Sequence, residues 1–229
     1  MFPIVIIPLI LFVSPVFPGD GAGLGRWFDI PMLMVGLAGQ GLRVLVVGYA
    51  YIKRGGLNKR VYADKLVTRG VFGHSRNALY VGNILMIASL LLIVGNFWGY
   101  VLGGPFFIFA YIAIVSAEEN FLREKFGAEY DDYCRRVNRW VPNFKGFGKS
   151  IEDMNFRWGR VVAKEYSSFS AWVLAVLAIE LSQTLRAPDI GEHTGFLVFL
   201  VAVFAVSLTA FLAARIYKKS GAFKEIDAS

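Results

Sequence analysis

Long apolar stretches constrain the fold of this chain more than any other feature. An α-helix needs about 20 apolar residues to cross a bilayer. Because backbone polar groups inside a membrane must be satisfied within the segment, such stretches predict helices. The sequence has six of them, at 1–18, 30–52, 78–94, 98–117, 169–185 and 195–216. We therefore expect an all-α, polytopic transmembrane helical bundle with about six spans.

The first stretch and the composition fit this expectation. Residues 1–18 contain no basic residue and are followed by no clear small-residue cleavage site, so we interpret them as a retained span rather than a signal peptide. The chain is 56% hydrophobic and 18% charged, whereas soluble domains carry about a quarter charged residues.

Basic residues gather in alternate loops. The loop that follows the second span, the segment 118–168 and the tail after Arg215 are rich in Lys and Arg. The opposite loops contain only Arg26 and Arg186 as basic residues. Since positive loops face the cytoplasm, we predict an integral protein of the cell inner (plasma) membrane with both termini cytoplasmic.

The reactive side chains exclude several kinds of site. Cys134 is the single cysteine, so no intrachain disulfide forms. His74 and His193 are the two histidines, which argues against a multi-histidine metal site, and we predict no metal. The net charge of +7 lies in the loops beside the membrane, so we predict membrane lipids rather than nucleic acid as partners.

The segment after the fourth span has an amphipathic helical pattern. Apolar residues recur there at intervals of three and four, which predicts one stripe along one cytoplasmic helix: Leu122, Phe126, Tyr130, Tyr133, Val137 and Trp140. Gly127 is expected to weaken or kink that helix, and Pro142 ends the segment. The acidic pair Glu118 and Glu119 stands where the span leaves the lipid, either as part of a cap or as a receptor for a cation.

A second polar segment precedes the third span. Gly70 and Gly73 permit a turn, and a helix is expected to begin near Asn77, with Arg76 at its entrance. Backbone N–H groups at a helix start, together with an arginine, form a carboxylate site. The alternative is that Arg76 only reaches toward phosphate headgroups.

Together the two segments resemble one family. The run Arg76-Asn77-Ala78-Leu79-Tyr80-Val81-Gly82 is similar to the Arg-His/Asn-Pro-x-Tyr-x-Gly motif of integral membrane methyltransferases, which include isoprenylcysteine carboxyl methyltransferases and phospholipid N-methyltransferases. The family's second block is an acid pair, Leu, Phe-Gly, two tyrosines and Arg-x-x-Pro. It is matched here by Glu118-Glu119, Leu122, Phe126-Gly127, Tyr130, Tyr133, Arg139 and Pro142. The family's proline is replaced by Ala78.

The resemblance implies an S-adenosyl-L-methionine-dependent methyltransferase with a lipophilic small-molecule or lipid-modified acceptor. The acceptor atom is left open among carboxylate, amine and thiol. Arg76, Asn77 and Arg139 would be the catalytic residues, with Arg76 either pairing with the cofactor carboxylate or orienting the acceptor. The cofactor-binding set would be His74, Arg76, Tyr80, Gly82, Glu118, Glu119, Tyr130 and Tyr133.

Three parts of the chain are expected. Residues 1–57 would form N-terminal transmembrane helices, 58–148 the methyltransferase-like core, and 149–229 a linker and two C-terminal transmembrane helices, with linker character beginning near Lys145. Arg43 and Glu180 lie at membrane depth. They would pair with each other or line the route of the acceptor, or Arg43 would extend its side chain toward the membrane surface.

Two alternatives remain. The chain could be a non-catalytic lipid-binding or scaffold member of the family, or a nicotinamide-dependent enzyme similar to sterol reductases. The sequence also leaves an oligomer open.

Overall fold

The fold is a bundle of long helices. The computed structural model describes residues 24–49, 65–186 and 190–219, and these contain helices and turns but no strand. The long helices are α2 (Leu24–Tyr49), α3 (Ala78–Val94), α4 (Gly104–Phe126), α7 (Trp158–Leu185) and α8 (Thr194–Lys219). Short elements are α5 (Ala128–Arg136), α6 (Phe147–Ile151), the 3-10 turns η1 (Gly70–Gly73) and η3 (Ile190–His193), and the π-helical turn η2 (Gly99–Gly103). The predicted all-α bundle is confirmed, while the first predicted span, 1–18, lies outside the described residues.

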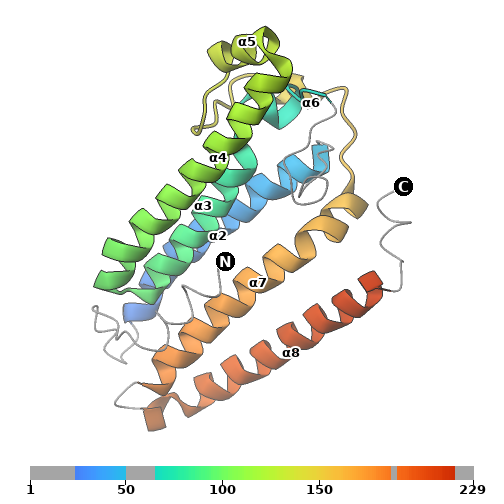
Figure 1. Cartoon of the computed structure of the whole chain (residues 1–229). Coiled ribbons are helices and arrows are strands. Elements are labelled where there is room, and N and C mark those ends of the chain that lie inside the picture. Colours follow the sequence, from blue (N-terminus) through green and yellow to red (C-terminus); the bar gives the residue numbers. More distant parts are fainter. Residues whose placement is uncertain (1–23, 50–64, 187–189, 220–229) are drawn as a thin grey trace.

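The long helices lie side by side (Figure 1). α2, α3 and α4 form one group, α7 packs on α2 and α3, and α8 packs on α7. The end of α2, the start of α3, the end of α4, α5, α6 and the start of α7 are all at the same end of the bundle. This arrangement brings the two polar segments singled out in the sequence to one end of the molecule.

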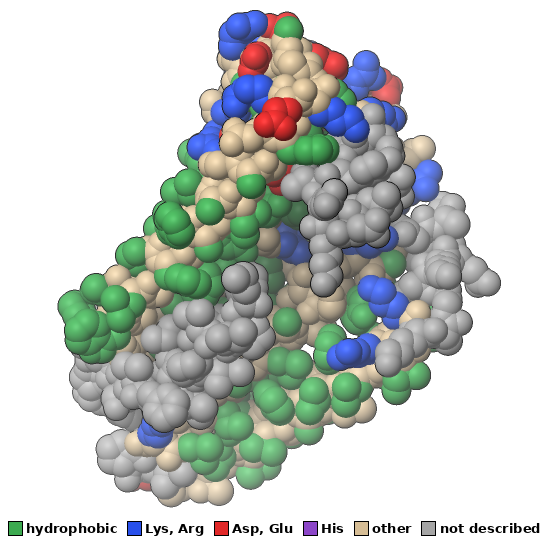
Figure 2. Space-filling model, viewed as in Figure 1, with side chains coloured by type: hydrophobic (Ala, Val, Ile, Leu, Met, Phe, Trp, Pro, Cys, Tyr) green, Lys and Arg blue, Asp and Glu red, His purple; other side chains and the backbone are tan. Residues whose placement is uncertain are grey.

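Within the described ranges, four helices are long and apolar enough to cross a membrane, judged by length and composition, and α3 is a shorter apolar helix. Their outward side chains are largely hydrophobic, as expected for a surface in contact with lipid. Figure 2 shows the same division, with charged side chains gathered at the end that carries α5 and hydrophobic ones along the helices.

Glycines set the contact between α2 and α3. A Cβ added to Gly39 of α2 would lie 2.6 Å from the Gly82 carbonyl oxygen, and one added to Gly82 would lie 2.7 Å from the Gly39 carbonyl oxygen. The two backbones therefore approach as closely as in other small-residue helix contacts of membrane proteins. Gly82 serves this contact, and its predicted role in the close approach of a cofactor stays a prediction.

The predicted hairpin of the third and fourth spans is confirmed. α3 covers the predicted residues 78–94 and ends at Gly95, whose φ of 63° places it in the left-handed region. The buried Asn96 then accepts hydrogen bonds from the backbone N–H groups of Trp98 (2.8 Å) and Gly99 (3.2 Å). The first backbone N–H groups of a helix have no acceptor within the helix, and these two bonds satisfy such groups at the start of the next helix.

The predicted single helix over residues 122–140 is wrong. α4 continues beyond the predicted span to Phe126, and the chain then turns at Gly127, whose φ is 51° and ψ is −124°. Such a backbone conformation strongly favours glycine. α5 follows as a separate helix, and Val137, with an extended backbone, lies beyond its end. The apolar stripe is therefore divided between two helices and a loop.

Two predicted boundaries in the C-terminal part are also corrected. α7 begins at Trp158 instead of residue 169, because its first turns carry charged residues that find partners inside the protein. The segment predicted as a linker contains α6, which starts after Gly146 in a left-handed conformation. The predicted last span is confirmed as α8.

The glycine contact gives the first prediction. Gly39→Val should lower the free energy of unfolding by about 2 kcal/mol, since the added side chain meets backbone that has little room to move. Gly41 is its matched control, because nothing lies within 4 Å of a Cβ added there. Thermal unfolding in detergent checks this: equal melting temperatures for Gly39→Val and Gly41→Val would contradict the close helix contact.

Candidate functional site

The segment before α3 and the segment after α5 run beside each other. The backbone N–H of Arg76 donates to the Asn138 carbonyl oxygen (2.9 Å), and that of Asn143 donates to the His74 carbonyl oxygen (2.9 Å). The Ser75 hydroxyl also donates to the Trp140 carbonyl oxygen (3.1 Å). The two sequence motifs, which stand at opposite ends of the α3–α4 hairpin sequence, thus meet in space.

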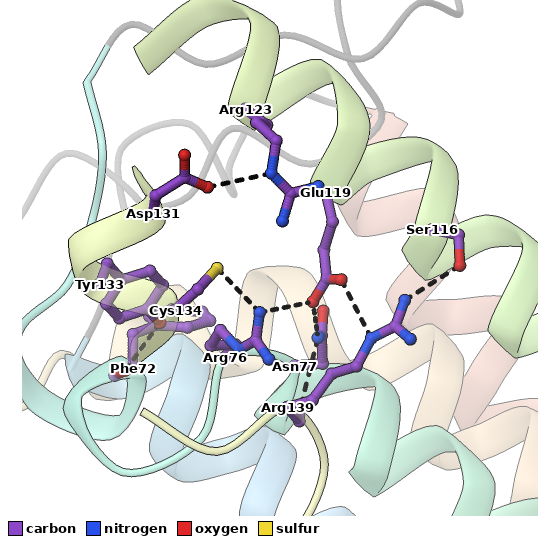
Figure 3. A network of polar contacts seen from close by, with 10 residues as sticks. All are labelled: Phe72, Arg76, Asn77, Ser116, Glu119, Arg123, Asp131, Tyr133, Cys134 and Arg139. Carbon is purple, nitrogen blue, oxygen red and sulfur yellow. Dashed lines mark hydrogen bonds and ion pairs between the residues drawn. The ribbon is translucent and has the colours of Figure 1, made fainter. Parts of the chain in front are cut away.

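Glu119 lies at the centre of this meeting point (Figure 3). Its Oε1 accepts a hydrogen bond from Asn77 Nδ2 (3.0 Å) and lies 3.5 Å from Arg76 Nη1. Its Oε2 lies 2.9 Å from Arg139 Nε. One buried carboxylate therefore joins α4 to the start of α3 and to the loop after α5. Such charge-assisted contacts are among the stronger polar interactions in proteins.

Positive charge exceeds negative charge at this cluster. Two guanidinium groups, those of Arg76 and Arg139, share the single carboxylate of Glu119. Arg76 Nη1 also donates to Cys134 Sγ (2.8 Å), and Arg139 Nη2 donates to Ser116 Oγ (2.9 Å). Arg76 Nε is buried and has no hydrogen-bond partner among the described residues. The cluster therefore has an excess positive charge and a hydrogen-bond donor, Arg76 Nε, that could bind an anion.

Glu118 has a different environment from its neighbour. The Tyr80 hydroxyl donates to Glu118 Oε2 (2.7 Å), and the carboxylate is half-buried. The Tyr80 ring meets the Tyr111 ring edge to face, with centroids 6.0 Å apart. Glu118 makes no ion pair with the cluster in the described part of the chain. The acidic pair is thus divided between one carboxylate that holds the structure together and one that is available to a ligand.

Tyr130 and Tyr133 hold α5 against the rest of the site. Both side chains are buried, and the Tyr133 hydroxyl donates to the Phe72 carbonyl oxygen in η1 (2.8 Å). Burial raises the pKa of each phenol above its ordinary value, and the nearby Glu119 carboxylate adds to the rise for Tyr130. Both phenols are therefore protonated at neutral pH and act as hydrogen-bonding and packing groups.

His74 faces a different part of this end of the protein. Its Nε2 lies 2.8 Å from Ser150 Oγ, and its Nδ1 is hydrogen bonded to the Asn143 carbonyl oxygen. The imidazole also meets the Phe147 ring, with centroids 5.3 Å apart. These contacts tie α6 to the segment before α3, and the predicted role of His74 in cofactor binding stays a prediction.

The structure adds two residues that the sequence interpretation missed. Ser116 and Cys134 each bind one of the two arginines. Ser116 stands one helical turn before Glu119, and Cys134 one turn after Tyr130, so their spacing placed them on the site face once the motifs were known. Neither residue type suggests this role without that spacing.

The fold and the site define an all-α membrane protein built around a polar cluster at one end of its helices. Residues 33–129 match the family described as phospholipid methyltransferase. This match confirms the resemblance to integral membrane methyltransferases that the two motifs indicated, and it supports a membrane methyltransferase in general. No curated protein and no solved structure matches the chain.

The different environments of the two acids give a second prediction. Glu119→Gln should lower the free energy of unfolding by roughly 2 kcal/mol, because two buried or partly buried guanidinium groups lose their carboxylate. Glu118→Gln should cost less than about 1 kcal/mol, since its amide oxygen still accepts from Tyr80. Melting temperatures of the purified variants test the order, and a larger loss for Glu118→Gln would show that the central carboxylate is misassigned.

Proposed function

We propose that this protein transfers a methyl group from S-adenosyl-L-methionine to a lipophilic acceptor at the membrane surface. The observation that carries the proposal is the meeting of both methyltransferase-like motifs at Glu119, with an excess guanidinium and a separate carboxylate beside it. The family match over 33–129 includes the whole first motif and the acidic pair. The methionine part of the proposed cofactor has one carboxylate and one ammonium, which these charges complement.

The proposed roles follow from the contacts. Arg76 binds the cofactor carboxylate, since its Nε is a buried donor without a partner in the described residues. Glu118 receives the ammonium or a ribose hydroxyl, because its carboxylate is half-buried and is held by the Tyr80 hydroxyl alone within the described part of the chain. Glu119 keeps Arg76 and Arg139 in place rather than contacting the cofactor.

The remaining residues position these groups. Asn77 precedes the first turn of α3 and donates to both Glu119 Oε1 and the Arg139 carbonyl oxygen (3.2 Å). Tyr130 and Tyr133 close the side formed by α5. Arg139, held by Ser116 and Glu119, limits the site on the side of the loop after α5.

The bound cofactor would supply an activated methyl group, so the chain has to align an acceptor and exclude water. No covalent intermediate on a side chain is required. The acceptor reaches the site from the lipid, because α4, which carries Glu118 and Glu119, turns apolar side chains such as Ile112 and Ile114 outward. The phospholipid methyltransferase match favours a lipid acceptor, and the accepting atom is a carboxylate oxygen, an amine nitrogen or a thiol sulfur.

We place the site on the cytoplasmic side of the inner (plasma) membrane. The segments that form it belong to the basic loops of the sequence, and such loops face the cytoplasm. Residues 58–148 would then be the methyltransferase core, preceded by the N-terminal helices of 1–57.

Binding of S-adenosylhomocysteine, the product form of the cofactor, tests the proposal. Isothermal calorimetry on detergent-purified protein should give micromolar binding for the wild type and a loss of at least tenfold for Arg76→Ala and for Glu118→Gln. Each lost charged contact accounts for such a change, since tenfold is about 1.4 kcal/mol. Glu124→Gln is the matched control, because it makes the same exchange at an exposed position of α4.

The outcomes separate the candidate functions. No binding to wild-type protein that is folded and helical would reject the methyltransferase and leave a lipid-binding or scaffold role. Binding of a nicotinamide cofactor in place of S-adenosylhomocysteine would support the reductase alternative. Equal losses in Glu124→Gln and Glu118→Gln would show that Glu118 is not a ligand.

A further inference from the structure

A second polar cluster lies inside the bundle, where α2, α3 and α7 meet. Arg43 of α2 places its guanidinium between α3 and α7. Its Nε lies 2.8 Å from Glu165 Oε2, its Nη2 donates to Ser168 Oγ (2.9 Å), and its Nη1 donates to Asn83 Oδ1. Every nitrogen of this guanidinium therefore has a partner, and the predicted pairing of Arg43 with Glu180 is wrong.

The Arg43–Glu165 pair is almost fully buried. The side chains are 6% and 3% exposed. Ionised groups at membrane depth are costly unless they are paired, and loss of one partner leaves the other as an uncompensated charge. Arg43 is thereby held in a single position by Glu165 and Ser168, both on the early turns of α7 that the apolar pattern did not predict.

The stem of Arg43 fixes the position of α3. A Cβ added to Gly82 would lie 2.6 Å from Arg43 Cγ, so this side chain fills the space beside Gly82. Gly82 and Asn83 stand within one turn of Tyr80, which binds Glu118. A shift of the Arg43 side chain would therefore move the part of α3 that carries the candidate site.

A series of contacts leads from Asn83 to the same place. The Asn83 side chain also interacts with the Tyr111 phenol of α4. The Tyr111 ring meets the Tyr80 ring edge to face, and the Tyr80 hydroxyl binds Glu118. The order of contacts is thus Glu165, Arg43, Asn83, Tyr111, Tyr80 and Glu118.

We propose that Glu165 is a positioning residue for the candidate site: through Arg43 it sets Asn83, Tyr111 and Tyr80, and so the orientation of the Glu118 carboxylate. This inference rests on the proposed function. Glu165 lies outside residues 33–129, the part that matches the phospholipid methyltransferase family. α7 is therefore a component of the catalytic unit of this chain and not only an added membrane anchor.

Glu165→Gln in the full-length protein tests the proposal, with Lys164→Gln as its control. Lys164 is the preceding residue of α7, and its side chain is exposed. Glu165→Gln should weaken S-adenosylhomocysteine binding about tenfold, while Lys164→Gln should bind as the wild type does. Circular dichroism and gel filtration verify that both variants are folded.

A double-mutant cycle separates positioning from a general structural effect. If Glu165 acts through Tyr80, Glu165→Gln combined with Tyr80→Phe should weaken binding no more than Tyr80→Phe alone. A purely structural role predicts that the two losses multiply. Multiplied losses, or unchanged binding in folded Glu165→Gln, would overturn the proposal.

The single cysteine gives a readout that does not depend on the cofactor. Cys134 Sγ accepts a hydrogen bond from Arg76, two residues before α3. If Glu165 holds α3, Glu165→Gln should raise the rate of Cys134 alkylation by a small maleimide at least threefold over wild type and Lys164→Gln. This rate decides the inference even if the wild type fails to bind S-adenosylhomocysteine, and equal rates in all three proteins would overturn it.

Discussion

The contacts of Glu119 are the interaction on which the candidate site depends. This carboxylate is the only described group that contacts Asn77, Arg76 and Arg139 together, and these residues come from two segments separated by α3, α4 and α5. The turn at Gly127 makes the arrangement possible, because it lets α5 leave the line of α4 and brings the following loop back to α3. The turn at Gly127 and the buried carboxylate of Glu119 thus bring two motifs that are distant in the sequence together in one site.

The membrane part supports this site through close helix contacts and one internal ion pair. Gly39 and Gly82 let α2 and α3 touch, and Arg43 reaches from that contact to Glu165 of α7. α8 has a different position, since it packs on α7 and leaves most of its apolar surface outward. The two C-terminal helices are therefore attached differently. Buried polar contacts join α7 to α2 and α3, whereas α8 packs on the outer face of α7.

Sequence reasoning predicted the apolar helices well where their ends carry local signals. α3 was predicted residue for residue, because Gly95 and Asn96 stop one helix and start the next through their own backbone and side-chain geometry. The start of α7 was missed for the opposite reason. Its charged residues look like a loop until their partners are known, and no local signal shows that Glu165 meets Arg43.

The site shows the same limit. The motifs identified Arg76, Glu119 and Arg139, and the structure brings these residues together. The sequence could not show which of the two adjacent acids forms the ion pairs and which is available to a ligand. Glu118 and Glu119 have the same side chain and differ only in the residues around them. The sequence also did not predict the contact between Gly82 and Gly39, because this contact depends on how two helices pack rather than on either segment alone.

The central claim is that the polar end of this bundle transfers a methyl group to a lipophilic acceptor. The most direct measurement is methyl transfer itself: purified protein in native lipid nanodiscs is given S-adenosylmethionine with a radiolabelled methyl group, and the organic extract is counted. Label in the lipid fraction, absent with Arg76→Ala, is the predicted result. No label above that of Arg76→Ala, from folded protein supplied with the lipids of its own membrane, would contradict the account.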